Sequence, residues 1–80
     1  MSERLADKVF VVTGAGGGIG AATVRRLLAE EARVVAADLD TATVTDALAG
    51  AAGDYRVTST DVRDEAAVEA LMAHAVNTFG

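Results

Sequence analysis

The feature that most constrains this chain is a short apolar run that breaks into glycines. Residues 9–20 read Val-Phe-Val-Val-Thr-Gly-Ala-Gly-Gly-Gly-Ile-Gly, with five glycines within seven positions. A continuous apolar run of strand length is typical of a parallel strand that is covered on both faces. The glycines allow a sharp turn into a helix, whose first backbone N–H groups lack partners and lie at the positive end of the helix dipole. The sequence therefore predicts a turn that binds phosphate groups.

The rest of the chain alternates strand-like and helix-like segments. We expect strands over 9–13, 34–37 (ending at Asp38) and 55–60, and helices from Gly18 to about Glu30, over 41–48 with Asp40 as N-cap, and from Asp64 onward. Alternation of this kind implies a parallel sheet with right-handed crossovers. The predicted fold class is α/β: a three-layer, Rossmann-type arrangement in the order β-α-β-α-β-α, which is the N-terminal half of a doubly wound fold.

The glycine spacing distinguishes between known nucleotide-binding motifs. A Gly-x-Gly-x-x-Gly motif starting at Gly14 fails because Ile19 stands at its last position, and one starting at Gly16 begins late after the strand. No Gly-Lys-Ser/Thr follows, so the P-loop is excluded. Thr13-Gly14-x-x-x-Gly18-Ile19-Gly20 fits directly after the strand, and it resembles the TGxxxGxG cofactor motif of the short-chain dehydrogenase/reductase family. The resemblance extends over nearly the whole chain.

The resemblance implies a set of cofactor-binding residues at the ends of the three strands. These are Gly14, Gly17, Gly18, Ile19 and Gly20 in the turn, Asp38 and Leu39 for the adenosine, and Asp61 and Val62 for the adenine. An aspartate before a helix is explained equally well as a helix cap, so both interpretations of Asp61 remain open. A glycine-rich loop without any ligand is the plainer alternative for the turn. A third possibility is a methyltransferase that uses a similar turn to bind S-adenosylmethionine. It predicts an acidic residue at the end of the first strand, where Thr13 stands.

Asp38 bears on the choice of coenzyme. It follows Gly20 by 18 residues, close to the spacing at which an acidic residue meets the adenosine ribose in dinucleotide-binding folds. A carboxylate accepts hydrogen bonds from both ribose hydroxyls and repels a 2′-phosphate. Neither Gly17 nor Leu39 supplies a positive charge that would offset this repulsion. We therefore expect NAD rather than NADP as cofactor, with a plain turn residue as the alternative for Asp38.

Composition excludes several classes of partner. The net charge is −5 and the seven basic residues are scattered, which argues against a nucleic acid or an anionic membrane surface. There is no cysteine, and the single histidine, His74, has no partner at ligand spacing, so no metal site is expected. The absence of a long apolar segment predicts neither a signal peptide nor a membrane span, which makes the cytoplasm the default location.

The family resemblance implies hydride transfer between a nicotinamide and a small alcohol or carbonyl substrate, in a complete enzyme that is a homodimer or homotetramer. The serine and the Tyr-x-x-x-Lys pair of that chemistry are absent, since Tyr55 is followed by Ser59 instead of lysine and Lys8 is the only lysine. No catalytic residue is therefore assigned. We expect residues 1–80 to be the N-terminal part of a single NAD-binding Rossmann domain, with the remainder absent. The alternative is a non-catalytic half-domain that binds an adenine nucleotide.

Two physical expectations follow from this interpretation. Glu31 stands where the family has a glycine that ends the first helix, and a left-handed glutamate there would cost about 1 kcal/mol relative to glycine. In a sheet of order 3-2-1-4 without its fourth strand, residues 9–12 would form an exposed edge. We therefore predict that the 80-residue chain is unstable or self-associating in isolation.

Overall fold

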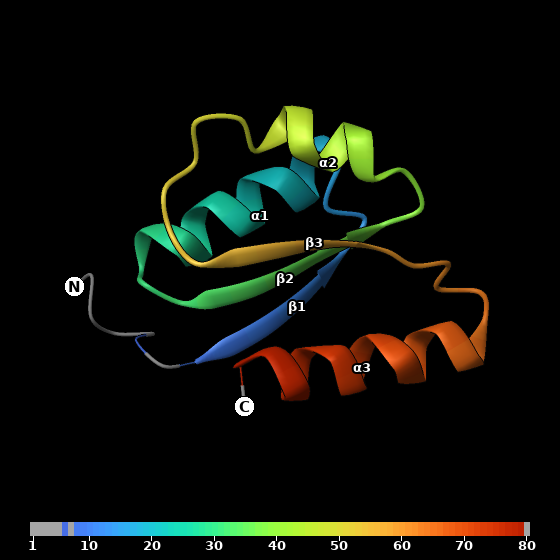
Figure 1. Cartoon of the computed structure of the whole chain (residues 1–80). Helices are drawn as coiled ribbons and strands as arrows, with labels where there is room; N and C mark the ends of the chain where they lie inside the picture. Colours follow the sequence, from blue (N-terminus) through green and yellow to red (C-terminus); the bar gives the residue numbers. More distant parts are fainter. Residues whose placement is uncertain (1–5, 7, 80) are drawn as a thin grey trace.

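Three strands and three helices alternate along the chain (Figure 1). The computed structural model describes residue 6 and residues 8–79. The elements are β1 (Val9–Thr13), α1 (Gly18–Ala29), β2 (Arg33–Asp38), α2 (Thr41–Ala47), β3 (Tyr55–Ser59) and α3 (Glu65–Phe79). The predicted order is confirmed, and the bounds differ by about one residue. β2 begins earlier than expected because the Arg33 N–H donates to the Lys8 carbonyl at 2.9 Å, which extends the ladder by one pair.

The three strands form one parallel sheet in the order β1-β2-β3, with Val35 paired to Val11 on one side and to Arg56 on the other. This agrees with the predicted order. The central strand β2 is buried from Val34 to Ala37. Helices pack on both faces of β1, as expected, but residues 9–12 are only half-buried because, among the described residues, no strand pairs with the other edge of β1.

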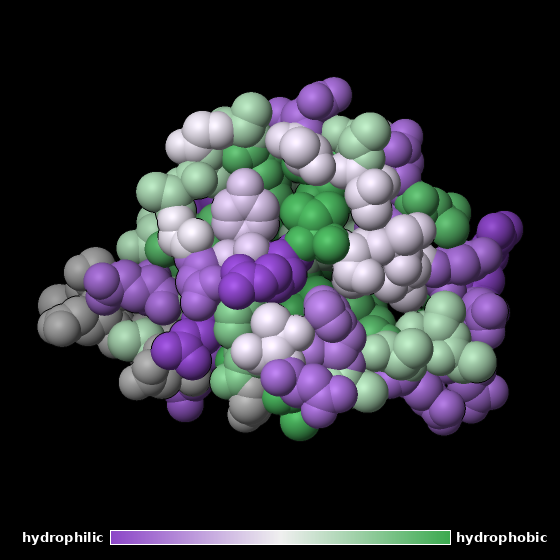
Figure 2. Space-filling model, viewed as in Figure 1, coloured by the Kyte–Doolittle hydropathy of each residue, from purple (hydrophilic) through white to green (hydrophobic). Residues whose placement is uncertain are grey.

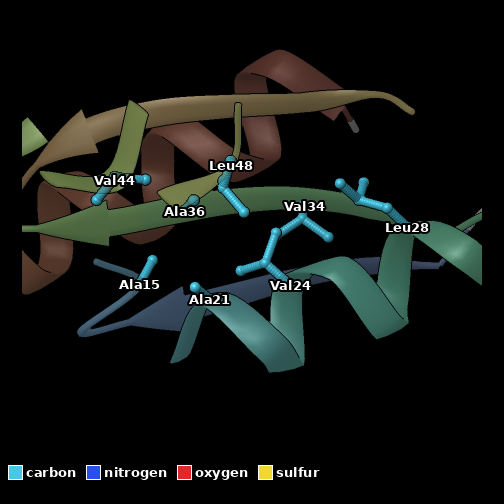
Figure 3. Close-up of a cluster of buried hydrophobic side chains, with 8 residues drawn as sticks. All are labelled: Ala15, Ala21, Val24, Leu28, Val34, Ala36, Val44 and Leu48. Atoms are coloured by element: carbon cyan, nitrogen blue, oxygen red, sulfur yellow. The ribbon is translucent and has the colours of Figure 1, made fainter. Parts of the chain in front are cut away.

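Helices cover both faces of the sheet. Helices α1 and α2 lie on one face and α3 on the other, as the crossover rule predicts (Figure 1). The larger core, drawn in Figure 3, consists of Ala15, Ala21, Val24, Leu28, Val34, Ala36, Val44 and Leu48. The smaller core joins the other side of β2 to Leu71 and Ala75 of α3. Met72 of α3 lies outside this core, with 47% of its surface exposed.

Local features hold the connections in place. Glu31 adopts φ 67° where α1 ends, which is the left-handed conformation that costs a glutamate about 1 kcal/mol relative to glycine. The Asp40 carboxylate accepts hydrogen bonds from the Ala42 and Thr43 N–H groups and caps α2, as predicted.

Hydrophilic residues lie across the middle of the molecule and over α3 in Figure 2, with smaller hydrophobic areas between them. Within the described residues, no helix combines the length and apolar character that a bilayer crossing requires.

Candidate functional site

The glycine-rich loop connects β1 to α1 at the carboxyl end of the sheet, which is the end where open α/β sheets bind ligands. Gly14 has φ 65°, a conformation that side chains with a Cβ rarely adopt. The next residue, Ala15, is fully buried, and its N–H donates to the Ala37 carbonyl at 3.0 Å. The loop is thereby anchored to the end of β2.

Gly20 allows the helix to start close under the loop. A Cβ at this residue would collide with the Gly14 carbonyl oxygen and come within 2.8 Å of the carbonyl carbon. Gly18 is different, because a Cβ there would meet no protein atom within 4 Å. The two glycines therefore have different reasons to lack a side chain. Gly20 is required by the fold, whereas the space beside Gly18 is open.

The first turn of α1 presents free backbone donors. Gly17 is the N-cap, its own N–H donates to the Gly14 carbonyl at 3.1 Å, and the first intrahelical bond runs from Ala21 to Gly17. The N–H groups of residues 18–20 have no acceptor among the residues that the structure describes. An isolated helix end leaves four N–H groups unpaired, and here three remain because the Gly17 N–H is bonded to Gly14. Three free N–H groups at a helix N-terminus favour the binding of an anion.

Asp38, at the end of β2, faces this loop. Its Oδ2 accepts a hydrogen bond from the Gly16 N–H at 3.0 Å, and its Oδ1 accepts one from the Asp40 N–H at 3.3 Å. The Gly16 bond, followed by those from Asp40 and Leu39, holds the pKa of Asp38 below its usual value, although partial burial acts in the opposite direction. The side chain is therefore an anion at neutral pH.

Asp61 does not have the capping role that the sequence left open. Asp64 caps α3 instead, accepting from the N–H groups of Ala66 and Ala67. The Asp61 carboxylate binds Arg63, whose Nε and backbone N–H both donate to Oδ1 at 3.1 and 2.9 Å. This bond from the Arg63 side chain is the main cause that lowers the pKa of Asp61. No sequence signal predicted this pair, because two residues of opposite charge in a loop meet only if the turn brings them together.

A cleft of about 340 Å³ lies beside the two carboxylates of Asp38 and Asp61. It lies between Gly14, the end of β2 at Asp38 and Leu39, and the segment 60–63 that follows β3. Leu39 and Val62 are 60% and 56% exposed, so the cleft carries two large apolar side chains beside two carboxylates. The structure thus brings together predicted residues from all three strand ends. Ile19 is 88% exposed and stands on α1, beside a different surface hollow.

Other side chains with reactive groups lie away from the cleft. His74 is exposed on α3, and its Nδ1 lies 3.4 Å from the Thr78 hydroxyl oxygen. In the part of the chain that the structure describes, no three histidine, cysteine or acidic side chains are grouped so that they could hold a metal ion. The described residues therefore present a binding site built from backbone N–H groups, carboxylates and apolar side chains.

Two residues of this site were not among the predicted set. A Cβ at Gly16 would lie 2.8 Å from Thr43 Cγ2 and 3.1 Å from Asp38 Oδ2, so glycine is needed for the loop to approach both β2 and α2. Thr43 of α2 lies opposite Gly16, and its side chain leaves no room for a Cβ at residue 16. The sequence contained one signal, since Gly16 is an additional glycine between Gly14 and Gly18 of the motif, but spacing alone does not show which partner it meets.

Comparison with known proteins supports the family resemblance that the glycine motif indicated. Residues 8–80 match the family model of short chain dehydrogenases. The chain is 45% identical over 82 residues to a cis-4-hydroxycyclohexanecarboxylate dehydrogenase from Sinomonas cyclohexanicum, and 35% identical over 77 residues to a galactitol 2-dehydrogenase from Agrobacterium fabrum (strain C58 / ATCC 33970). The alignments cover 100% and 96% of this chain.

A solved structure shows the same arrangement of elements. A short chain dehydrogenase/reductase from Burkholderia phymatum, crystallised in complex with NAD, matches 95% of this chain with a TM-score of 0.84 and 35% sequence identity. The match covers 28% of that protein, and this chain spans 33% of the Sinomonas relative. The chain therefore corresponds to about a third of the length of the proteins it matches.

Proposed function

This chain belongs to the short-chain dehydrogenase/reductase family, and we propose that it binds the adenosine diphosphate part of NAD. The observation that carries the proposal is the row of three free N–H groups of residues 18–20, which faces the same end of the sheet as the Asp38 carboxylate. The N–H groups would receive the diphosphate, and the carboxylate would receive the ribose next to it. Gly14 and Gly17 would shape the turn that holds these donors in place.

The cleft supports the same placement of the adenosine. Leu39 and Val62 would contact the faces of the adenine ring. Both side chains are exposed to water in the cleft, so covering them with a flat aromatic ring would make the free energy of binding more favourable. Asp61 retains oxygen lone pairs beyond those used by Arg63, since a carboxylate has about four acceptor sites. It would accept a hydrogen bond from the adenine amino group.

The charge at Asp38 supports NAD over NADP. A 2′-phosphate would stand within a few ångströms of this carboxylate, and two like charges about 4 Å apart repel by about 4 kcal/mol at an effective dielectric constant of 20. Leu39, the next residue, adds no positive charge. The Arg63 guanidinium also lines the cleft, but it is paired with Asp61.

We propose further that residues 1–80 form the N-terminal part of a single Rossmann domain in a longer enzyme. When bound, the nicotinamide supplies or accepts the hydride that interconverts a small alcohol and its carbonyl compound. The residues of this chain would bind and orient the cofactor, and the groups that act on the substrate would lie outside it. A homodimeric or homotetrameric enzyme and a cytoplasmic location remain predictions from the family resemblance and the sequence.

Titration calorimetry with NAD, NADP and AMP tests the proposal on the 80-residue chain, under conditions in which circular dichroism shows that the chain is folded. We expect saturable binding of NAD and AMP, and binding of NADP that is at least tenfold weaker, because the repulsion at Asp38 exceeds the 1.4 kcal/mol that corresponds to a factor of ten. Equal affinity for NAD and NADP would contradict the assignment of Asp38. Binding by the chain itself would also leave open the second candidate function, a nucleotide-binding half-domain without catalysis.

A further inference from the structure

The Asp61 carboxylate receives three hydrogen bonds from a single residue, Arg63. The backbone N–H and the Nε of Arg63 donate to Asp61 Oδ1 at 2.9 and 3.1 Å, and its Nη2 donates to Oδ2 at 3.1 Å. The two side-chain bonds form a bidentate pair, which is the geometry in which a planar guanidinium fixes the plane of a carboxylate. Arg63 therefore determines how the carboxylate is turned.

These three bonds leave little of the carboxylate open to a ligand. A carboxylate has about four acceptor sites, two on each oxygen. Oδ1 uses both of its sites for Arg63 and Oδ2 uses one, so among the described residues one site, on Oδ2, has no donor. The Asp61 side chain is 35% exposed and lines the cleft, which places this open site within reach of a ligand there.

We propose that Arg63 is a positioning residue, which holds Asp61 so that the cleft selects a purine with an amino group at C6 over one with a carbonyl group there. The inference rests on the proposed function, because the base enters the cleft as part of the nucleotide. The fixed acceptor on Oδ2 takes one N–H of the amino group, and it repels the carbonyl oxygen of a 6-oxopurine. A carboxylate that is free to turn can instead accept the N1–H of a 6-oxopurine, so the selection depends on Arg63.

Two substitutions separate positioning from charge. Arg63→Ala removes the guanidinium, whereas Arg63→Lys keeps the positive charge but cannot bond both carboxylate oxygens in one plane. A guanidinium that acted by its charge alone would attract the diphosphate, which is common to 5′-ADP and to its 6-oxopurine counterpart, 5′-IDP. Charge alone therefore predicts that Arg63→Ala weakens the binding of both nucleotides equally and that Arg63→Lys changes neither. Positioning predicts that both substitutions lower the preference for 5′-ADP.

Titration calorimetry of the 80-residue chain with 5′-ADP and 5′-IDP gives this preference as a ratio of affinities, with circular dichroism to verify folding. We expect a ratio of about tenfold for the unsubstituted chain, which corresponds to one charge-assisted hydrogen bond. Each substitution of Arg63 should lower the ratio by about fivefold, the upper end for an exposed ion pair. Arg56→Lys is the matched control and should leave the ratio unchanged, because Arg56 also pairs with an aspartate two residues earlier, Asp54, but at the other end of β3.

The side-chain Nε–H signal of Arg63 in the ¹⁵N-labelled chain reports its bond to Asp61, and this signal should persist at saturating 5′-ADP. Loss of the signal when 5′-ADP binds would show that the base displaces Arg63, which would overturn the positioning role. Equal affinity of the unsubstituted chain for the two nucleotides, or a ratio that either substitution of Arg63 leaves unchanged, would overturn it as well and leave the proposed function intact. Failure of the unsubstituted chain to bind either nucleotide would overturn the proposed function, and the positioning role with it.

Discussion

At the scale of single residues, Gly18 and Gly20 show how neighbouring glycines in one motif differ. Gly20 lies against the Gly14 carbonyl, whereas Gly18 faces open space. We predict that Gly20→Ala destabilises the fold by about 1–3 kcal/mol, because backbone atoms cannot move aside as a flexible side chain does. Urea denaturation followed by circular dichroism measures this effect.

Gly18→Ala is the matched control for that substitution. It should leave the free energy of unfolding nearly unchanged, or raise it slightly by favouring the helix, and it should weaken the binding of 5′-ADP, since its Cβ would stand where the diphosphate is proposed to lie. Equal destabilisation by the two substitutions would show that the close approach at Gly20 is not the reason for that glycine.

The two acidic residues of the cleft give stability a predictable pH dependence. The pKa values of Asp38 and Asp61 are lowered in the folded chain, mainly by the Gly16 N–H and by Arg63 respectively. Their contribution is therefore complete above the unfolded carboxyl pKa of about 3.9 and is lost as the pH falls from there through the lowered folded values. We expect the free energy of unfolding to decrease over this range, and Asp38→Asn to reduce the decrease.

Urea titrations at pH 7 and pH 3 measure that difference. Asp46→Asn is the comparison, because Asp46 is exposed on α2 and its side chain makes no hydrogen bond with the described residues. An unchanged pH dependence in Asp38→Asn would show that the hydrogen bonds to this carboxylate contribute nothing to stability.

At the scale of elements, the sequence predicted every strand and helix but not every end. The apolar run of β1 and the valine and alanine run of β2 are strong signals, because few other structures bury such segments. Arg33 was left out of β2 since a charged residue does not extend an apolar pattern, yet its backbone N–H pairs with Lys8. The end of β3 was placed one residue late, at Thr60, whose N–H bonds to the Asp38 carbonyl beyond the ladder.

The short helix α2 is stabilised by hydrogen bonds at both of its ends. Asp40 caps its start, and Arg25 of α1 donates to the carbonyls of Ala47 and Ala49 at 2.8 and 3.0 Å. We predict that Asp40→Ala lowers the free energy of unfolding by about 1 kcal/mol, the usual loss when a helix cap is removed. Thermal unfolding measures it, with Asp46→Ala as the control. A loss no larger than that of the control would argue against the cap.

At the scale of the whole molecule, the two edges of the sheet differ. The β3 edge carries the exposed, charged Arg56, and charged side chains discourage pairing with another strand. The β1 edge reads Val-Phe-Val-Val and carries no charge. We predict that the 80-residue chain associates through β1 and has a mass above that of a monomer in light scattering.

Phe10→Lys tests which edge is used. Phe10 is half-buried and belongs to neither of the two core clusters, so the substitution should shift the chain toward a monomer without emptying the core. Arg56→Lys keeps the charge on the other edge and should change nothing. A chain that is monomeric in light scattering and unfolds sharply in circular dichroism would contradict the prediction.

The candidate site was only partly predictable because its parts have different origins. Glycine spacing and the position of Asp38 are visible in the sequence, since they depend on where a strand ends. The bond from Gly16 to Asp38 depends on how loops from separate strands pack, and the pairing of Arg63 with Asp61 depends on the turn within the segment that follows β3. Such contacts follow from three-dimensional geometry, which periodicity and spacing do not encode.

In the proposed complex, the first turn of α1 receives a diphosphate while the end of β2 receives the adjoining adenosine. Backbone amide spectra of the ¹⁵N-labelled chain, titrated with 5′-ADP and with adenosine, separate these two contacts. We expect the signals of Gly18, Ile19 and Gly20 to move with 5′-ADP alone, and those of Leu39 and Val62 to move with both ligands. Stationary signals for residues 18–20 at saturating 5′-ADP would contradict it.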